Sequence, residues 1–339
     1  MRAVLVQRHG EPGDVLALAE VAEPTPGPGE AVLEVEAAAL NLPDVSLCRG
    51  GYILHPPLPF TPGLDAGGRI AAVGAGVPPG LVGARVTSVP ELPHGGLAER
   101  CIVKVDRLYA IPPSVSMADA VAAQIVFQTA HLTLHHRGGL RAGETVLVLG
   151  AAGGVGTATV QLARLAGARV IAVVGGAEKA RRCRELGAHE AIDHTATPDV
   201  AAALRELTGG RGAEVVVDPV GGEAFEQARR CVAVDGRILV VGFASGSVPS
   251  VALHHVLMKS YAIVGVYVGA YAGSEAGRAL VQRTHAEVMQ LLASGKIRPV
   301  IDRVVGLDGV AAALGDLAAR RVVGKIVVDP KRAVGPERR

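Results

Sequence analysis

Residues 145–167 read TVLVLGAAGGVGTATVQLARLAG, and this stretch decides the fold of its part of the chain. It begins as an apolar run typical of a buried strand and ends in a segment with apolar residues at helical spacing. Between the two, Ala151, Gly153 and Gly156 occupy the small positions of a G-x-G-x-x-G turn. A strand, a glycine turn and a helix in this order let backbone N–H groups face a pyrophosphate. We therefore expect a dinucleotide site, with alanine at the first position as the main departure and a ligand-free tight turn as the alternative.

The pattern of apolar residues differs on the two sides of this turn. Downstream, helical segments separate the apolar runs RVIAVV, EAIDH, EVVVDPV, RILVVG and YAIVGVYV. Strands that alternate with helices predict a doubly wound parallel sheet, which is an α/β fold. Upstream, the short runs AVLVQ, AVLEVEAAAL, GGRIAAVGAGV and ARVTSV are broken by proline and glycine and indicate a mostly-β unit. A helix that starts after Ser116 marks the change between them.

Composition argues against several classes of protein. The chain has 339 residues, enough for about two domains. Its 34 basic and 32 acidic residues leave a net charge of +2, so we expect no nucleic-acid partner. The four cysteines have no paired spacing, and the first apolar run is too short for a signal sequence, so we expect a cytoplasmic protein. Residues 145–163 lack charge, but the glycine turn within them argues against a membrane span.

The residues after the second apolar strand indicate which dinucleotide binds. NAD sites usually carry an acid at this strand's tip, whereas RVIAVV ends in Gly175 and Gly176. The next turn holds Lys179, Arg181 and Arg182, whose cations suit a 2′-phosphate. We therefore expect NADPH. The alternative is an ordinary basic helix start whose cations face water, partly offset by Glu178, in a protein that uses both dinucleotides or NADH.

Ordered blocks along nearly the whole chain resemble one family. They are AAALNLPDVSLCRGGY, PGLDAGGRIAAVGAGV, GGLAERCIV, the GAAGGVG turn, GGAEKARRCRELGA, VVVDPVGG, GRILVVGFASG and GKIVV. Together they resemble the zinc-independent quinone oxidoreductases (zeta-crystallin-like) of the medium-chain dehydrogenase/reductase superfamily. The resemblance implies a GroES-like, mostly-β catalytic domain from residues 1–120 and 266–339. It also implies an inserted Rossmann domain from residues 121–265.

The resemblance also implies roles for individual residues. Asn41 and Asp44 would line the nicotinamide and substrate side as catalytic residues, and Tyr52 would lie at the substrate mouth. For Tyr52 we weigh a hydrogen-bond or proton donor against simple packing, and for Asp44 a general base against a structural cap. His194 stands where this branch often has a tyrosine. The implied cofactor contacts are Asn41, Thr129, Gly153, Gly154, Val155, Gly175, Lys179, His194, Phe243, Ala244 and Lys325.

No metal site is expected. Zinc alcohol dehydrogenases of the same superfamily need cysteine and histidine ligands that converge on the metal. The matching stretches here are NLPD, with Leu42 and Pro43 in place of a thiolate, and PGLDAGG, with Leu64 in place of a histidine. His131 and His135 have helical chelate spacing without a cysteine or acid partner nearby, so we expect a polar helix face instead.

These features favour an NADPH-dependent quinone oxidoreductase that transfers hydride to quinones or activated enones. One alternative is an enoyl- or acryloyl-thioester reductase on the same scaffold. Another is an NADPH-binding structural or adaptor protein without turnover. We also expect a homodimer, because the late apolar run YAIVGVYV would leave an open sheet edge, although the segment AYAGSEAG is an alternative cover for it.

Overall fold

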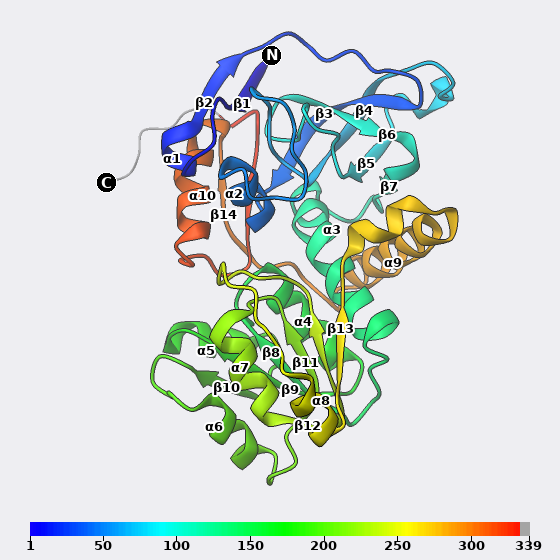
Figure 1. The fold of residues 1–339 in the computed structure, drawn as a ribbon. Helices are drawn as coiled ribbons and strands as arrows, with labels where there is room; N and C mark the ends of the chain where they lie inside the picture. Colours follow the sequence, from blue (N-terminus) through cyan, green and yellow to red (C-terminus); the bar gives the residue numbers. More distant parts are fainter. Residues whose placement is uncertain (333–339) are drawn as a thin grey trace. The chain divides into compact units, whose positions relative to one another are not determined.

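The computed structural model describes residues 1–332, which form two compact units (Figure 1). The first unit combines Met1–Ile125 with the described chain from His285 onward. The second unit is Val126–Thr284. Two helices continue through these boundaries, α3 (Met117–His131) and α9 (Glu275–Ala293). The side chain of Ser116 caps α3, because its Oγ accepts a hydrogen bond from the N–H of Asp119 at 3.0 Å.

The first unit is built on a seven-stranded sheet with the order β14-β15-β3-β4-β5-β7, and β6 pairs with β3. Its strands are β3 (Glu30–Ala39), β4 (Ala66–Val73), β5 (Arg85–Ser88), β6 (Arg100–Lys104), β7 (Tyr109–Ala110), β14 (Ile301–Val305) and β15 (Lys325–Val328). The pair β1 (Arg2–Val6) and β2 (Leu16–Glu20) forms a separate ribbon. The short helices are α1 (Pro12–Val15), α2 (Leu42–Cys48) and α10 (Val310–Ala318). The early sequence runs thus form the strands that their pattern predicts.

The two chain ends share the core of this unit. β15 pairs antiparallel with β3, so that Val327 lies opposite Ala39 and Val328 opposite Ala38. The buried cluster mixes early residues such as Leu33 and Phe60 with late ones such as Leu314 and Ile326. This pairing carries Lys325 to the start of α2, more than 280 positions away in sequence.

The second unit is a six-stranded parallel sheet with the order β10-β9-β8-β11-β12-β13. Its strands are β8 (Thr145–Leu149), β9 (Arg169–Val174), β10 (Glu190–Asp193), β11 (Ala213–Asp218), β12 (Val232–Val240) and β13 (Ala262–Gly265). The helices between them are α4 (Gly154–Leu165), α5 (Ala177–Glu185), α6 (Val200–Leu207), α7 (Gly222–Cys231) and α8 (Leu253–Lys259) (Figure 1). The predicted α/β architecture of a mostly-β unit and a doubly wound sheet is confirmed.

The chain order reverses beside β8. From β8 it proceeds outward through β9 to β10, and then returns to β11 on the other side of β8. Such a switch point opens a crevice at the carboxyl ends of the two central strands, where dinucleotides bind in this class of sheet. Two strands of this sheet differ from the predicted runs. β12 begins at Val232, five residues before the run RILVVG. β13 is only four residues long, because a 3-10 turn occupies Val268–Gly273 soon after it.

Candidate functional site

The glycine turn lies between β8 and α4, at the switch point of the sheet. Gly150 has a φ of +58°, whereas Ala151 is an ordinary buried residue whose N–H donates to the Val173 carbonyl at 3.1 Å. The left-handed conformation thus falls on Gly150, which explains why alanine is accepted at the motif's first position. At the third position a Cβ on Gly156 would lie 2.3 Å from the Gly150 carbonyl oxygen. Only glycine allows α4 to approach β8 this closely.

The first turn of α4 is suited to an anion. Gly153 is its N-cap and supplies no side chain, and Gly154 and Val155 are its first two residues. The first N–H groups of a helix have no partner within the helix and carry the positive end of its dipole. The turn, with Gly153, Gly154 and Val155, therefore has the geometry expected of a pyrophosphate cradle.

Gly175 and His194 lie together at the tips of β9 and β10. A Cβ on Gly175 would be 3.1 Å from His194 Nε2, so the imidazole lies close over this glycine. An acid does occur here, but it comes from β10: Asp193 accepts hydrogen bonds from Gly176 N–H at 2.8 Å and from Thr195 N–H at 2.9 Å. The Thr195 hydroxyl and the Gly176 N–H lower the pKa of Asp193. Sequence reasoning examined only the tip of β9 and missed this carboxylate.

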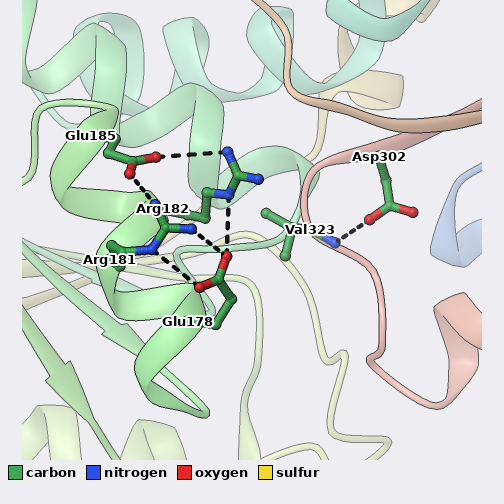
Figure 2. A network of polar contacts seen from close by, with 6 residues as sticks. All are labelled: Glu178, Arg181, Arg182, Glu185, Asp302 and Val323. Atoms are coloured by element: carbon green, nitrogen blue, oxygen red, sulfur yellow. Dashed lines mark hydrogen bonds and ion pairs between the residues drawn. The ribbon is translucent and has the colours of Figure 1, made fainter.

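Two arginines of α5, Arg181 and Arg182, are engaged within their own helix (Figure 2). Arg181 forms ion pairs with Glu178 at 2.6 Å and with Glu185, and Arg182 lies 3.5 Å and 3.7 Å from the same two carboxylates. Both guanidinium groups thus lie beside acids of their own helix, as expected of a basic helix start that Glu178 partly offsets, and their pairing with a 2′-phosphate stays a prediction. The spacing EKARRCRE placed acids three and four positions from these arginines, which is the pattern of intrahelical pairs. Lys179 is the residue of this turn that the resemblance assigns to the phosphate.

Two further cofactor candidates follow β12. Phe243 is 42% exposed, and the Ala244 N–H donates to the Pro219 carbonyl at 3.0 Å. They thus belong to a loop that is hydrogen-bonded to the loop after β11.

Thr129 lies in α3, where its carbonyl accepts a hydrogen bond from the Thr133 hydroxyl at 2.6 Å. The helix continues from there as a π-helical turn over Leu132–Arg137, a distortion often found near functional sites.

In the first unit, Asp44 is a structural cap. It is fully buried, and its Oδ2 accepts the Asn41 N–H at 2.8 Å while its Oδ1 accepts the Gly63 N–H at 3.1 Å. It therefore closes the capping box of α2 and fixes the adjacent turn. Burial raises the pKa of Asp44 to about 6, opposed by these hydrogen bonds and by Lys325. Both carboxylate oxygens thus accept hydrogen bonds from backbone N–H groups, as expected if Asp44 is a structural cap and not a general base.

Lys325 and Asp65 complete a buried polar cluster with Asn41. Lys325 Nζ donates to the Leu40 carbonyl at 2.7 Å and to Asn41 Oδ1 at 2.5 Å, and lies 3.8 Å from Asp65 Oδ2. Asn41 Nδ2 donates to the Ala39 carbonyl at 3.0 Å, so this side chain is held by internal contacts. In the part of the chain that the structure describes, neither Asp65 oxygen has a hydrogen bond of normal geometry.

Charge and burial oppose each other in this cluster. Burial lowers the pKa of Lys325, against the attraction of Asp65 and Asp44, and raises the pKa of Asp65 to about 7, against the attraction of Lys325. Sequence reasoning missed Asp65, although an acid inside the apolar stretch PGLDAGG was the available signal. The ammonium group occupies the space next to Asn41, where sequence reasoning expected a contact with the cofactor.

Tyr52 lies just after α2. It is partly buried and packs against the core of the first unit. The loop that follows it exposes Ile53, Leu54 and Leu58. Tyr52 thus anchors an apolar loop, which is compatible with either of the roles weighed for it.

Comparisons with known proteins identify the family. An "Alcohol dehydrogenase GroES-like domain" model matches residues 27–113, and a "Zinc-binding dehydrogenase" model matches residues 154–291. A quinone oxidoreductase-like protein 2 homolog from Nematostella vectensis is 34% identical over 333 residues, which cover 98% of this chain and 89% of that protein. The chain belongs to the quinone oxidoreductases of the medium-chain dehydrogenase/reductase family. As a member of this family, it is an oxidoreductase.

Solved structures agree with this family. A mycobacterial protein solved with NADPH superimposes with a TM-score of 0.89 at 32% identity, covering 97% of this chain and 100% of that one. Escherichia coli quinone oxidoreductase, also solved with NADPH, gives a TM-score of 0.85 at 27% identity, covering 97% and 100%. Among the residues described for this oxidoreductase, no cluster of three or more His, Cys, Asp or Glu side chains is placed to hold a metal ion. The same residues include no helix with the length and apolar character to cross a bilayer.

Proposed function

We propose that this oxidoreductase binds NADPH and reduces quinones or activated enones by hydride transfer, without zinc. The observation that carries the proposal is the glycine turn at the switch point, where Gly156 brings α4 against the Gly150 carbonyl. This contact sets the uncapped start of α4 at the position where a pyrophosphate binds in such sheets. The NADPH in two similar solved structures supports the choice of dinucleotide.

Different residues would bind different parts of the dinucleotide. Gly153, Gly154 and Val155 would hold the pyrophosphate, and Gly175, Lys179 and His194 would surround the 2′-phosphate. Thr129, Phe243 and Ala244 would contact the nicotinamide end. Bound NADPH supplies the hydride, and this chain's task is to hold the acceptor in register with it and to stabilise the charge that develops on the acceptor oxygen.

On the acceptor side, Tyr52 is our candidate for a hydrogen-bond or proton donor. A phenol can stabilise the oxyanion of a reduced quinone or an enolate and can also pass on a proton. Asn41 and Lys325 would act together, because the ammonium group donates to Asn41 Oδ1 at 2.5 Å. Asp44 would hold α2 in place through the Asn41 and Gly63 N–H groups.

The same cluster supports zinc independence. The Leu40 and Asn41 oxygens are directed at the Lys325 ammonium, whose positive charge would repel a metal cation in that place. Leu64, which stands where a histidine ligand is expected, is buried in the core. Because no Lewis acid would then polarise an alcohol, acceptors that already take hydride well are favoured.

The proposal is tested by following the absorbance of the reduced nicotinamide in metal-stripped protein. We expect the protein to reduce p-benzoquinone faster with NADPH than with NADH. With NADPH, we also expect it to reduce p-benzoquinone faster than an enoyl-CoA. Faster turnover of the enoyl-CoA would favour the thioester reductase. Tight NADPH binding without consumption by any acceptor would contradict a reductase and favour the adaptor alternative.

We further propose that a second copy of this chain pairs with the β13 edge. β13 ends the six-stranded sheet, and Ile263 on it is 39% exposed. Beside it in sequence, Leu257 and Met258 of α8 are 78% and 81% exposed. An exposed sheet edge next to apolar side chains suits an isologous contact, in which the same patch is used by both copies.

A further inference from the structure

The loop after β11 is held by one buried carboxylate. Asp218, the last residue of β11, is fully buried, and its Oδ1 accepts the N–H groups of Val220 at 2.7 Å and Gly221 at 2.9 Å. Its Oδ2 is also buried and has no hydrogen-bond partner within residues 1–332. Two backbone donors on one oxygen fix the course of the turn that follows the strand.

The loop after β12 is built on this turn. The Asp218 carbonyl accepts the Val241 N–H at 2.8 Å, and the Pro219 carbonyl accepts the Ala244 N–H at 3.0 Å. The Val220 carbonyl accepts the Ser245 N–H at 2.9 Å. In the opposite direction, the Gly222 N–H donates to the Ser247 carbonyl at 3.1 Å. The two loops are therefore joined like a pair of short strands, and the first cannot shift without the second.

The Phe243 ring lies against the residue that Asp218 holds. A Cβ on Gly221 would be 2.9 Å from Phe243 Cδ1 and 2.8 Å from the Ser247 carbonyl oxygen, and Gly221 has a φ of +69°. Glycine is therefore required for both its conformation and this contact. Val220 belongs to the same turn and touches the glycine turn, since a Cβ on Gly150 would lie 3.0 Å from its Cγ2. The turn after β11 thus connects the dinucleotide cradle to Phe243.

We infer that Asp218 is a positioning residue for hydride transfer. Through the Gly221 N–H it sets the place of the Phe243 ring, and through the joined loops it sets the place of Ala244. The inference rests on the proposed function, in which these two residues contact the nicotinamide end. Asp218 itself touches no ligand, because both of its side-chain oxygens are sealed in the interior or used by the backbone.

The test compares Asp218→Ala with Asp218→Asn. The asparagine retains an oxygen for the Val220 and Gly221 N–H groups, whereas alanine removes the acceptor and frees the turn. We expect Asp218→Ala to lower kcat with p-benzoquinone by up to roughly 10²-fold, the effect of a small misplacement of reacting groups. NADPH affinity should change much less, because the phosphates are held elsewhere. Asp218→Asn should retain most of the wild-type kcat.

Phe243→Ala separates positioning from a general loss of structure. Its ring is exposed enough for this variant to fold. If Asp218 acts through Phe243, then Asp218→Ala should lower kcat little further in the Phe243→Ala background. Equal losses of kcat in both backgrounds, or a loss of NADPH affinity as large as that of kcat, would overturn the inference.

A second readout keeps this inference distinct from the proposed function. The fluorescence of bound NADPH reports the surroundings of the nicotinamide without any turnover. If the wild-type protein reduces no acceptor, the proposed function fails, and the fluorescence still decides the role of Asp218. We expect Asp218→Ala to change that emission in the direction of free NADPH and Asp218→Asn to retain it. Identical emission from all three proteins would contradict the inference.

Discussion

At the scale of single residues, we expect two cations that lie two positions apart on α5 to have different tasks. Arg181 is bound to Glu178 and Glu185 within α5 (Figure 2), whereas Lys179 is the α5 residue we assign to the 2′-phosphate. We predict that Lys179→Met lowers the NADPH:NADH ratio of kcat/KM by about tenfold or more, the value of one charge-assisted hydrogen bond. The matched control is Arg181→Met, which should leave the ratio unchanged. Steady-state kinetics with both dinucleotides measures this, and an equal effect of the two substitutions would contradict the assignment.

The buried cluster makes a second prediction at this scale. Lys325→Met would leave Asp65 and Asp44 in the interior without their cation, and we expect the free energy of unfolding to fall by about 3–5 kcal/mol. Adding Asp65→Asn removes one uncompensated charge and should restore a large part of that loss. Urea unfolding of the two single variants and the double variant measures the coupling. Additive losses would show that the lysine and the carboxylate, 3.8 Å apart, do not stabilise each other.

At the scale of elements, helix α9 is attached to β7 through a buried histidine. The His285 ring stacks on Tyr109 at 4.9 Å, and its Nε2–H donates to the Ala110 carbonyl at 3.1 Å. Burial lowers the pKa of His285 from 6.5 to about 4. Between these two values the unfolded chain binds a proton that the folded chain excludes, so this contribution to stability is present above pH 6.5 and is lost as the pH falls toward 4.

We predict that His285→Phe removes this pH dependence while it retains the ring stacking. The wild-type protein should lose about 3 kcal/mol more than the variant between neutral pH and pH 4, as expected from the pKa shift. Denaturant unfolding at a series of pH values gives the difference between the two proteins. The raised pKa values of Asp44 and Asp65 act in the opposite direction, but they are common to both proteins and cancel. Parallel stability curves would contradict the prediction.

Elements defined by local pattern could be predicted from the sequence, and contacts between distant elements could not. The glycine turn needs only a strand, a helix and the small residue at position 156, all within 23 neighbouring residues. The cluster of Asn41, Asp65 and Lys325 depends on the pairing of β3 with β15, which no local pattern specifies. The acid Asp193 was missed for the same reason, because it reaches the tip of β9 from the next strand.

At the scale of the whole molecule, the assembly is the remaining prediction. β13 is four residues long, so edge pairing alone supplies few hydrogen bonds, and the exposed Leu257 and Met258 of α8 would have to supply apolar contact area. We predict that replacing both by Glu, in one double variant, converts a dimer into a monomer, because two like charges would face their own copies across the two-fold axis. Sedimentation equilibrium measures the mass. Leu165→Glu is the matched control, since Leu165 is 46% exposed on α4 and should leave the mass unchanged. A dimer that survives the double substitution would exclude the α8 surface, and a monomeric wild-type protein would exclude the assembly itself.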